Sequence, residues 1–135
     1  MIPAMAAVTR RLGFAVTVST TYEQPYALAR TMTTLDHLTE GRIGWNVVTS
    51  ALDSAARNLG LDRQIPHDER YLIADEFMDV TYKLWEGSWE DGAVVRDAEA
   101  GVSPTRRRCT RSSTAGRTSA CPVSPCPSRP CSAPR

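Results

Sequence analysis

A parallel α/β fold is predicted for the first hundred residues, and three observations predict it. Two short apolar segments, residues 12–20 and 43–49, have the two-residue periodicity of β-strands. The segment between them has apolar residues at helical spacing, and the links that join it to both strands are short. Strand, helix and strand in this order form a βαβ unit with a right-handed crossover. The sequence therefore predicts two parallel strands joined by a helix.

The first predicted strand has one bulky face and one small face. Leu12, Phe14, Val16 and Val18 alternate with Gly13, Ala15, Thr17 and Ser19. Because the second face is small rather than charged, we expect both faces to be buried. Helices would cover the bulky face, and the small face would point into a crowded interior.

The connecting helix and the second strand follow from the next segment. Pro25 suits the first turn of a helix, where its missing N–H costs nothing, and Gly41 is a natural stop. In the strand that follows, Asn46 shares a face with Gly44 and Val48, opposite the bulky residues. If the bulky residues face outward, Asn46 points into the same interior as the small face of the first strand.

A second long helix is predicted from His67 to Trp85, after the break at Pro66. Its expected apolar stripe consists of Tyr71, Ala74, Met78, Tyr82 and Trp85, with Phe77 alongside. Residues 51–60 are expected to form a short helix or an ordered loop. Residues 1–11 have the pattern of the end of an earlier helix.

The composition divides the chain into a body, residues 1–102, and a tail, residues 103–135. The body has nine basic and fifteen acidic residues, a net charge of −6, whereas the tail has seven Arg and no acid. The tail also holds six of the nine prolines and lacks Leu, Ile, Phe, Tyr and Trp. Such a segment cannot bury a core, so the C-terminal tail is predicted to be disordered.

Composition also narrows the classes of ligand and partner. All four cysteines lie in the tail, with no CxxC pair and no nearby histidine, so no metal site is expected. A net charge of +1 for the whole chain indicates neither nucleic acid nor membrane as a partner. No segment resembles a membrane span or a signal peptide, which favours a cytoplasmic protein.

Polar residues gather where the two predicted strands end. Parallel α/β folds bind ligands at the C-terminal ends of their strands. The candidates there are Thr17, Ser19, Thr20 and Asn46. Neutral donors and acceptors suit a polar heterocycle or a phosphate rather than a metal. Strand-end caps that bond to loop backbone explain the same pattern equally well.

His67 and Tyr71 lie four residues apart on one helix face, so both can address one ligand. His67 stands at the helix N-terminus, which favours a phosphate. On pattern alone, a capping histidine and a core tyrosine are the slightly favoured alternative. No nucleophile motif, phosphate-loop glycines or zinc-binding histidine pair is present, so catalytic residues are not identified.

Four motifs together resemble one family. They are STTYEQPYALAR (residues 19–30), TLDHLTEGRIGWNVVTS (34–50), ARNLGL (56–61) and PHDERYLIADEF (66–77). Over roughly residues 2–102 the chain resembles the bacterial luciferase-like flavin monooxygenases. Within them it is similar to the branch of nitrilotriacetate monooxygenase component A, with the dibenzothiophene-sulfone and pristinamycin-related enzymes. The resemblance implies an α/β fold that is part of a TIM (β/α)₈ barrel, about strands three and four with their helices.

The resemblance also implies a cofactor and partners. FMN would contact the strand-three hydroxyls (Thr17, Ser19 or Thr20), Asn46, His67 and Tyr71. In this family FMN is used as FMNH₂ supplied by a separate NAD(P)H:flavin reductase. One oxygen atom of O₂ is added to a small organic substrate through a flavin C4a-hydroperoxide. The full-length form is expected to be a homo-oligomer.

The chain departs from this family in length and in its tail. A (β/α)₈ barrel needs about 250 residues, and two strands leave both sheet edges open. We therefore expect a fragment that is inactive alone. GC-rich codons can be chosen for residues 103–123 so that the adjacent frame reads LADPAKVHALEHRGPDFRVPG, which resembles the family's continuation. A frameshift near Val102 is the hypothesis that follows.

Two alternatives stay open. The same fold also hosts enzymes that use a deazaflavin to transfer hydride instead of activating oxygen. In a different class, the chain is a non-enzymatic interaction piece whose basic tail binds acidic partners.

Overall fold

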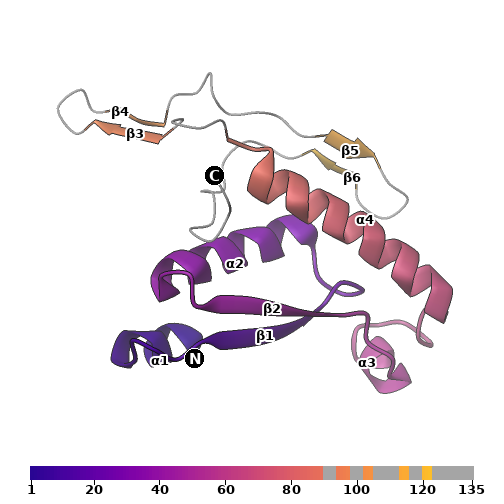
Figure 1. Ribbon diagram of the computed structural model, residues 1–135. Helices are drawn as coiled ribbons and strands as arrows, with labels where there is room; N and C mark the ends of the chain where they lie inside the picture. Colours follow the sequence, from indigo (N-terminus) through magenta and orange to yellow (C-terminus); the bar gives the residue numbers. More distant parts are fainter. Residues whose placement is uncertain (90–93, 98–101, 105–112, 116–119, 123–135) are drawn as a thin grey trace.

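The computed structural model describes residues 1–89, 94–97, 102–104, 113–115 and 120–122, and after residue 89 it describes backbone only. The elements in chain order are α1 (Ile2–Val8), β1 (Phe14–Ser19), α2 (Pro25–Thr39), β2 (Ile43–Val48), α3 (Asp53–Asn58), α4 (His67–Glu86), β3 (Val94–Asp97), β4 (Val102–Pro104), β5 (Ser113–Ala115) and β6 (Ala120–Pro122). Figure 1 shows α2 and α4 on one side of the sheet formed by β1 and β2, with α3 beyond the ends of these strands. Every predicted helix and strand of the body is present. Their ends lie within two residues of those expected, except that α1 ends three residues before residue 11.

The βαβ unit is confirmed. β1 and β2 are parallel and in register from Phe14 opposite Ile43 to Ser19 opposite Val48. α2 begins at Pro25 and ends in a turn in which Gly41 has φ +81°. The Gly41 N–H donates to the carbonyl of Asp36 at 3.0 Å. A residue with a side chain rarely adopts this backbone conformation, so glycine allows the chain to reverse into β2.

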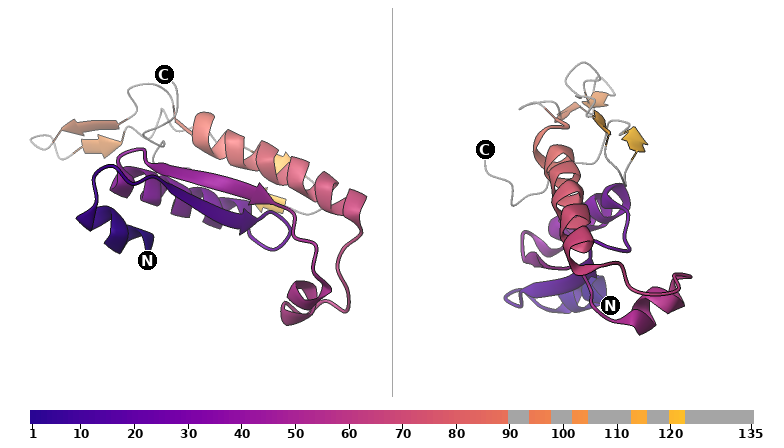
Figure 2. Two further views of the ribbon diagram at one scale, coloured as in Figure 1. Left: turned by 60° about the horizontal axis from the view of Figure 1, so that its bottom comes forward. Right: turned by 90° about the vertical axis from the view of Figure 1, so that its right-hand side faces the viewer.

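The core lies between the bulky face of the sheet and the two long helices (Figure 2). Leu28 and Met32 of α2 pack with Phe77 of α4, and Val18 and Trp45 of the strands pack against this cluster. The Trp45 indole N–H donates to the carbonyl of Val18 at 3.1 Å, so its one polar atom is satisfied within the core. The bulky residues of the strands therefore face the helices, as predicted.

The small face of the sheet differs from expectation. Ala15, Thr17, Gly44 and Asn46 are exposed, whereas both faces were expected to be buried. Alternation along a strand reports which side chains share a face, but burial needs a second layer. None of the described elements lies across this face, so it is open.

The buried face of α4 also differs from the predicted stripe. Ala74 and Phe77 are buried as expected, but Tyr71 and Tyr82 are about half exposed. The buried positions are Arg70, Ala74, Phe77, Val80, Thr81 and Leu84. α4 packs against α2 and the sheet together, and this contact is centred between Phe77 and Val80 rather than on the tyrosines.

The later strands form two short antiparallel pairs, β3 with β4 and β5 with β6. The predicted boundary at residue 102 and the predicted disorder of residues 103–135 lie largely outside the described residues. Cys109, Cys126 and Cys131 lie outside them as well. Within the described residues, no helix is long and apolar enough to cross a membrane.

Candidate functional site

The first pair of predicted site residues meets on the open face of the sheet. Thr17 of β1 and Asn46 of β2 are register partners. The Asn46 Nδ2 donates to the Thr17 Oγ1 at 3.1 Å, and both residues are exposed. Two neutral polar groups are thus held side by side on rigid strands, on a face that is otherwise small.

Ser19 lies at the end of β1 and is tied to the segment after β2. The Ser50 Oγ donates to the Ser19 Oγ at 2.9 Å, and the backbone N–H of Thr21 donates to the same oxygen at 3.3 Å. Ser50 has a left-handed backbone, with φ 55°, which turns the chain at this point. The Ser19 Oγ is thus hydrogen-bonded to residues that follow both strands.

Thr20 is placed differently from the other predicted hydroxyls. It is 1% exposed, and its N–H and Oγ1 both donate to the carbonyl of Val48, at 2.9 and 3.4 Å. Next to it, the Thr21 Oγ1 donates to the carbonyl of Thr49 at 2.6 Å. These threonines cap the strand ends, as the strand-end alternative expects, and Thr20 does not reach the open face.

His67 and Tyr71 lie one above the other in the first two turns of α4. Their ring centroids are 4.7 Å apart and the ring planes are inclined by 36°. The His67 Nδ1 lies 2.9 Å from Oδ1 of Asp68, and both side chains are largely exposed. Tyr71 is therefore a surface residue of α4 rather than the core tyrosine of the alternative interpretation.

Both rings line a groove between the C-terminal end of β2 and α4. Its volume is about 570 Å³. The walls are Val47, Val48, Thr49, Ser50, Ala51, His67, Arg70, Tyr71, Ala74, Asp75 and Met78. Ser50 links this groove to Ser19, whereas Thr17 and Asn46 do not line it. The predicted site residues thus form two groups, one on the open face of the sheet and one along α4.

Arg70 is a groove residue that the sequence interpretation missed. It is 7% exposed, its Nη1 donates to the carbonyl of Thr49 over a long 3.5 Å, and its Nε has no partner. Among the described residues, no carboxylate lies within salt-bridge distance of it. A buried charge without a counter-ion is costly, so this guanidinium is suited to an anion.

One signal could have pointed to Arg70. It stands four residues before Ala74 and seven before Phe77, so it shares their helix face. A charged residue on the buried face of a helix either forms an ion pair or belongs to a binding site. The predicted apolar stripe placed Tyr71 on the buried face instead. Arg70 and Tyr71 are adjacent and differ by about 100° around the helix, so Arg70 was assigned to another face.

Anion binding also suits the position of the groove. The first turn of α4 has free backbone N–H groups, and the helix dipole adds positive potential there. His67 and Arg70 both lie in this turn, together with the carboxylates of Asp68 and Glu69. Among the described residues, no group of three or more His, Cys, Asp or Glu could hold a metal ion. The buried Arg70 and the start of α4 therefore suit an anion such as a phosphate.

Parallel strands joined by helices, with polar groups at the C-terminal ends of the strands, occur in TIM-barrel enzymes. The sequence profile described as luciferase-like monooxygenase matches residues 1–123. The chain belongs to the luciferase-like monooxygenase family. The predicted resemblance and the predicted fold class, part of a TIM barrel, are confirmed.

Three curated relatives have close sequences. Dimethyl-sulfide monooxygenase of Hyphomicrobium sulfonivorans is 65% identical over 101 residues, 75% of this chain and 21% of that protein. Long-chain alkane monooxygenase of Geobacillus thermodenitrificans (strain NG80-2) is 64% identical over 102 residues, 76% and 23% of the two chains. Nitrilotriacetate monooxygenase component A of Aminobacter aminovorans is 50% identical over 101 residues, which are 75% of this chain and 22% of that protein. The chain therefore spans less than a quarter of the length of these relatives.

Two solved structures have the same arrangement. The crystal structure of a long-chain alkane monooxygenase matches with a TM-score of 0.87 and 53% identity, over 96% of this chain and 30% of that chain. Riboflavin lyase with modified FMN and riboflavin matches with a TM-score of 0.87 and 41% identity, over 96% and 29%. The described elements are thus arranged as in one part of these larger proteins.

Proposed function

We propose that this chain is part of a two-component, FMNH₂-dependent monooxygenase that adds one oxygen atom of O₂ to a small organic substrate. The named activities of the relatives support the reaction class, since they are monooxygenases of dimethyl sulfide, a long-chain alkane and nitrilotriacetate. The name "component A" supports a partner, which would be an NAD(P)H:flavin reductase. Reduced FMN, when bound, would supply the electrons that activate O₂.

The observation that carries this proposal is the buried Arg70 in the groove beside α4. FMN ends in a phosphate, and the unpartnered Arg70 Nε, the first-turn N–H groups and His67 together favour a dianion there. The Tyr71 hydroxyl is a further donor on the same wall. This donor set fits the phosphate, so the chain's residues are consistent with the cofactor.

The flavin ring would lie toward the sheet. Its polar edge requires neutral donors and acceptors, which the Thr17–Asn46 pair and Ser19 offer. The role of these side chains would be to bind and orient the ring. Thr20 would support them indirectly, because it holds the ends of β1 and β2 together.

Two further parts of the proposal concern the chain as a whole. Reduced-flavin oxygen chemistry needs a site closed to water, and the small face of the sheet is open. We therefore expect the isolated 135-residue chain to be inactive. As the family resemblance implies, we expect the complete enzyme to be a homo-oligomer. A frameshift near Val102 would explain why the curated relatives align over only 101 or 102 residues.

One of the two earlier alternatives is now less favoured, and the other stays untested. A solved relative that contains modified FMN, at 41% identity, supports FMN over a deazaflavin. The interaction-piece alternative depends on a tail that lies largely outside the described residues. It would be supported by salt-sensitive binding to acidic partners that is lost when residues 103–135 are deleted.

The test compares FMN with riboflavin, which lacks the phosphate, by fluorescence titration of the chain. We expect FMN to bind at least tenfold more tightly, and Arg70→Met to remove this preference. Arg57→Met is the matched control, since Arg57 lies on α3 and lines none of the cavities described above. Equal binding of FMN and riboflavin by the unmodified chain would overturn the phosphate assignment.

A second experiment tests the reading frame of the gene and the enzymatic activity of its product. The gene is sequenced across codons 90 to 135, and all three frames are read. If the neighbouring frame continues the barrel, one base is restored and the product is assayed with a flavin reductase, NAD(P)H and O₂. We expect substrate-dependent oxygen transfer from the restored protein only. An intact frame across these codons would refute the frameshift hypothesis.

A further inference from the structure

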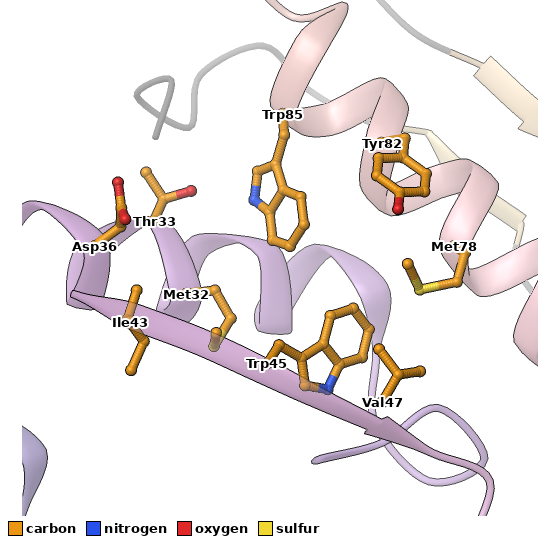
Figure 3. Close-up of a pocket in the computed structure, with 9 residues that line it drawn as sticks. All are labelled: Met32, Thr33, Asp36, Ile43, Trp45, Val47, Met78, Tyr82 and Trp85. Atoms are coloured by element: carbon orange, nitrogen blue, oxygen red, sulfur yellow. The ribbon is translucent and has the colours of Figure 1, made fainter. Parts of the chain in front are cut away.

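A second cavity lies on the bulky side of the sheet, between α2, β2 and α4 (Figure 3). Its volume is about 270 Å³. Its walls are Met32, Thr33, Asp36, Ile43, Trp45, Val47, Met78, Tyr82 and Trp85. It shares only Val47 and Met78 with the groove beside α4, so it is a separate space.

One wall of this cavity carries a buried hydroxyl without a partner. Thr33 is 2% exposed, and its Oγ1 makes no hydrogen bond. Figure 3 shows this hydroxyl pointing from α2 toward Trp85. A buried polar group without a partner destabilises the folded state, and such groups are rare in native proteins.

The reason for this exception is visible in the neighbouring side chains. Threonines in helices normally donate to the carbonyl four residues earlier, as Thr31 and Thr34 do on α2 at 2.9 Å. For Thr33 that acceptor is the carbonyl of Ala29. The Trp85 indole N–H already donates to this oxygen at 3.2 Å. The hydroxyl of Thr33 is therefore directed into the cavity.

The remaining walls define the kind of molecule that would satisfy this hydroxyl. The rings of Trp45, Tyr82 and Trp85 and the thioethers of Met32 and Met78 favour an aromatic body. The Asp36 carboxyl, 2% exposed, lines the cavity near Thr33 and disfavours an anion. An engineered cavity of about 150 Å³ holds benzene, so this larger one has room for two fused rings.

We propose that this cavity is a binding site for a small neutral aromatic molecule that carries one hydroxyl or N–H group. The polar group hydrogen-bonds to the Thr33 Oγ1, and the rings lie between Trp45 and Trp85. Entry is from the side of Val47 and Tyr82, which are 43% and 51% exposed. The site is independent of the proposed flavin groove, because none of the groove's polar residues lines it.

The test is calorimetric titration of the full chain with 2-naphthol and with 2-naphthoate, which differ in charge. We expect saturable binding of 2-naphthol and none of 2-naphthoate. Thr33→Val keeps the side-chain shape. It should weaken the binding of 2-naphthol by about three- to tenfold, the usual contribution of one hydrogen bond. Thr33→Ser keeps the hydroxyl and should restore binding. Thr34→Val is the matched control and should leave binding unchanged.

A pair of ring-adding variants tests the location. Ile43→Phe fills the cavity and should abolish binding, whereas Leu38→Phe adds the same ring at an exposed position of α2 and should not. The proposal is overturned if 2-naphthol does not saturate, which is the result for a cavity that holds water alone. Binding that survives Ile43→Phe, or that is equal in Thr33→Val and Thr33→Ser, overturns it as well.

Discussion

The Asn46 amide donates to the Thr17 hydroxyl across two parallel strands, at 3.1 Å and on an exposed face. Most polar pairs on a sheet face are dispensable, because water replaces either partner. This pair stands on the small face, which would point into the interior of a (β/α)₈ barrel because the helices cover the other face. Its importance is therefore expected in ligand binding rather than in folding.

Thr17→Val tests this distinction. Valine keeps the shape and the strand preference of threonine, so the free energy of unfolding should change by less than about 0.5 kcal/mol. The affinity for FMN should fall by about three- to tenfold, because one hydrogen-bonding group is lost. Denaturant unfolding and a flavin titration measure the two effects. A large loss of stability with unchanged flavin affinity would show that the pair is structural.

The core between the helices should contribute most of the free energy of unfolding of residues 1–89. Leu84 is 1% exposed and Leu59 is 60% exposed. Leu84→Ala should lower the free energy of unfolding by about 2–5 kcal/mol, because it leaves a cavity in a packed core. Leu59→Ala, the matched control, should change it by less than about 0.5 kcal/mol. Similar losses in both variants, by urea denaturation, would contradict the packing described.

Gly41 should be required for its backbone conformation alone. Its φ is +81°, and a Cβ placed there would meet no atom within 4 Å. Gly41→Ala should therefore destabilise the protein by about 1 kcal/mol through backbone strain without any clash. Gly44→Ala is the comparison, since its Cβ would make ordinary contact with the Phe14 carbonyl at 3.7 Å and its φ is not positive. Thermal unfolding should separate the two, and an unchanged Tm for Gly41→Ala would be evidence against the strain.

Phosphate alone should stabilise the chain if Arg70 belongs to an anion site. A ligand that binds only the folded state raises the Tm in proportion to the logarithm of its concentration above its Kd. We expect inorganic phosphate to raise the Tm of the unmodified chain and of Arg57→Met, but not of Arg70→Met. Sodium chloride at equal ionic strength controls for screening. An equal rise for all three proteins would show that the effect is general.

Arg70→Met should also report on the cost of the buried charge. Methionine has a similar length and no charge, so without phosphate the variant should be as stable as the unmodified chain, or up to about 1 kcal/mol more stable. A strongly destabilised variant would indicate that the bond from Arg70 to the Thr49 carbonyl supports the fold. This measurement distinguishes a structural arginine from one held for a ligand.

Much of the body could be predicted from local pattern. Alternation placed both strands, and Pro25 and Pro66 marked the starts of both long helices. The motifs around STTYEQPYALAR and PHDERYLIADEF were specific enough to indicate the family, which the profile match confirms. The FMN-contact residues that this resemblance implied stay a prediction, although the structure does bring Thr17 to Asn46 and His67 to Tyr71.

The sequence by itself determined the order of the elements, their ends and the face that each strand residue occupies, because these depend on the backbone and on neighbours along the chain. Only the tertiary structure decided which side of α4 is buried, since the rotation of a helix depends on what packs against it. The same packing buries Arg70 without a counter-ion, and it lets Trp85 take the acceptor that Thr33 would otherwise use. Both candidate binding sites therefore arise from packing between residues that are distant in the chain.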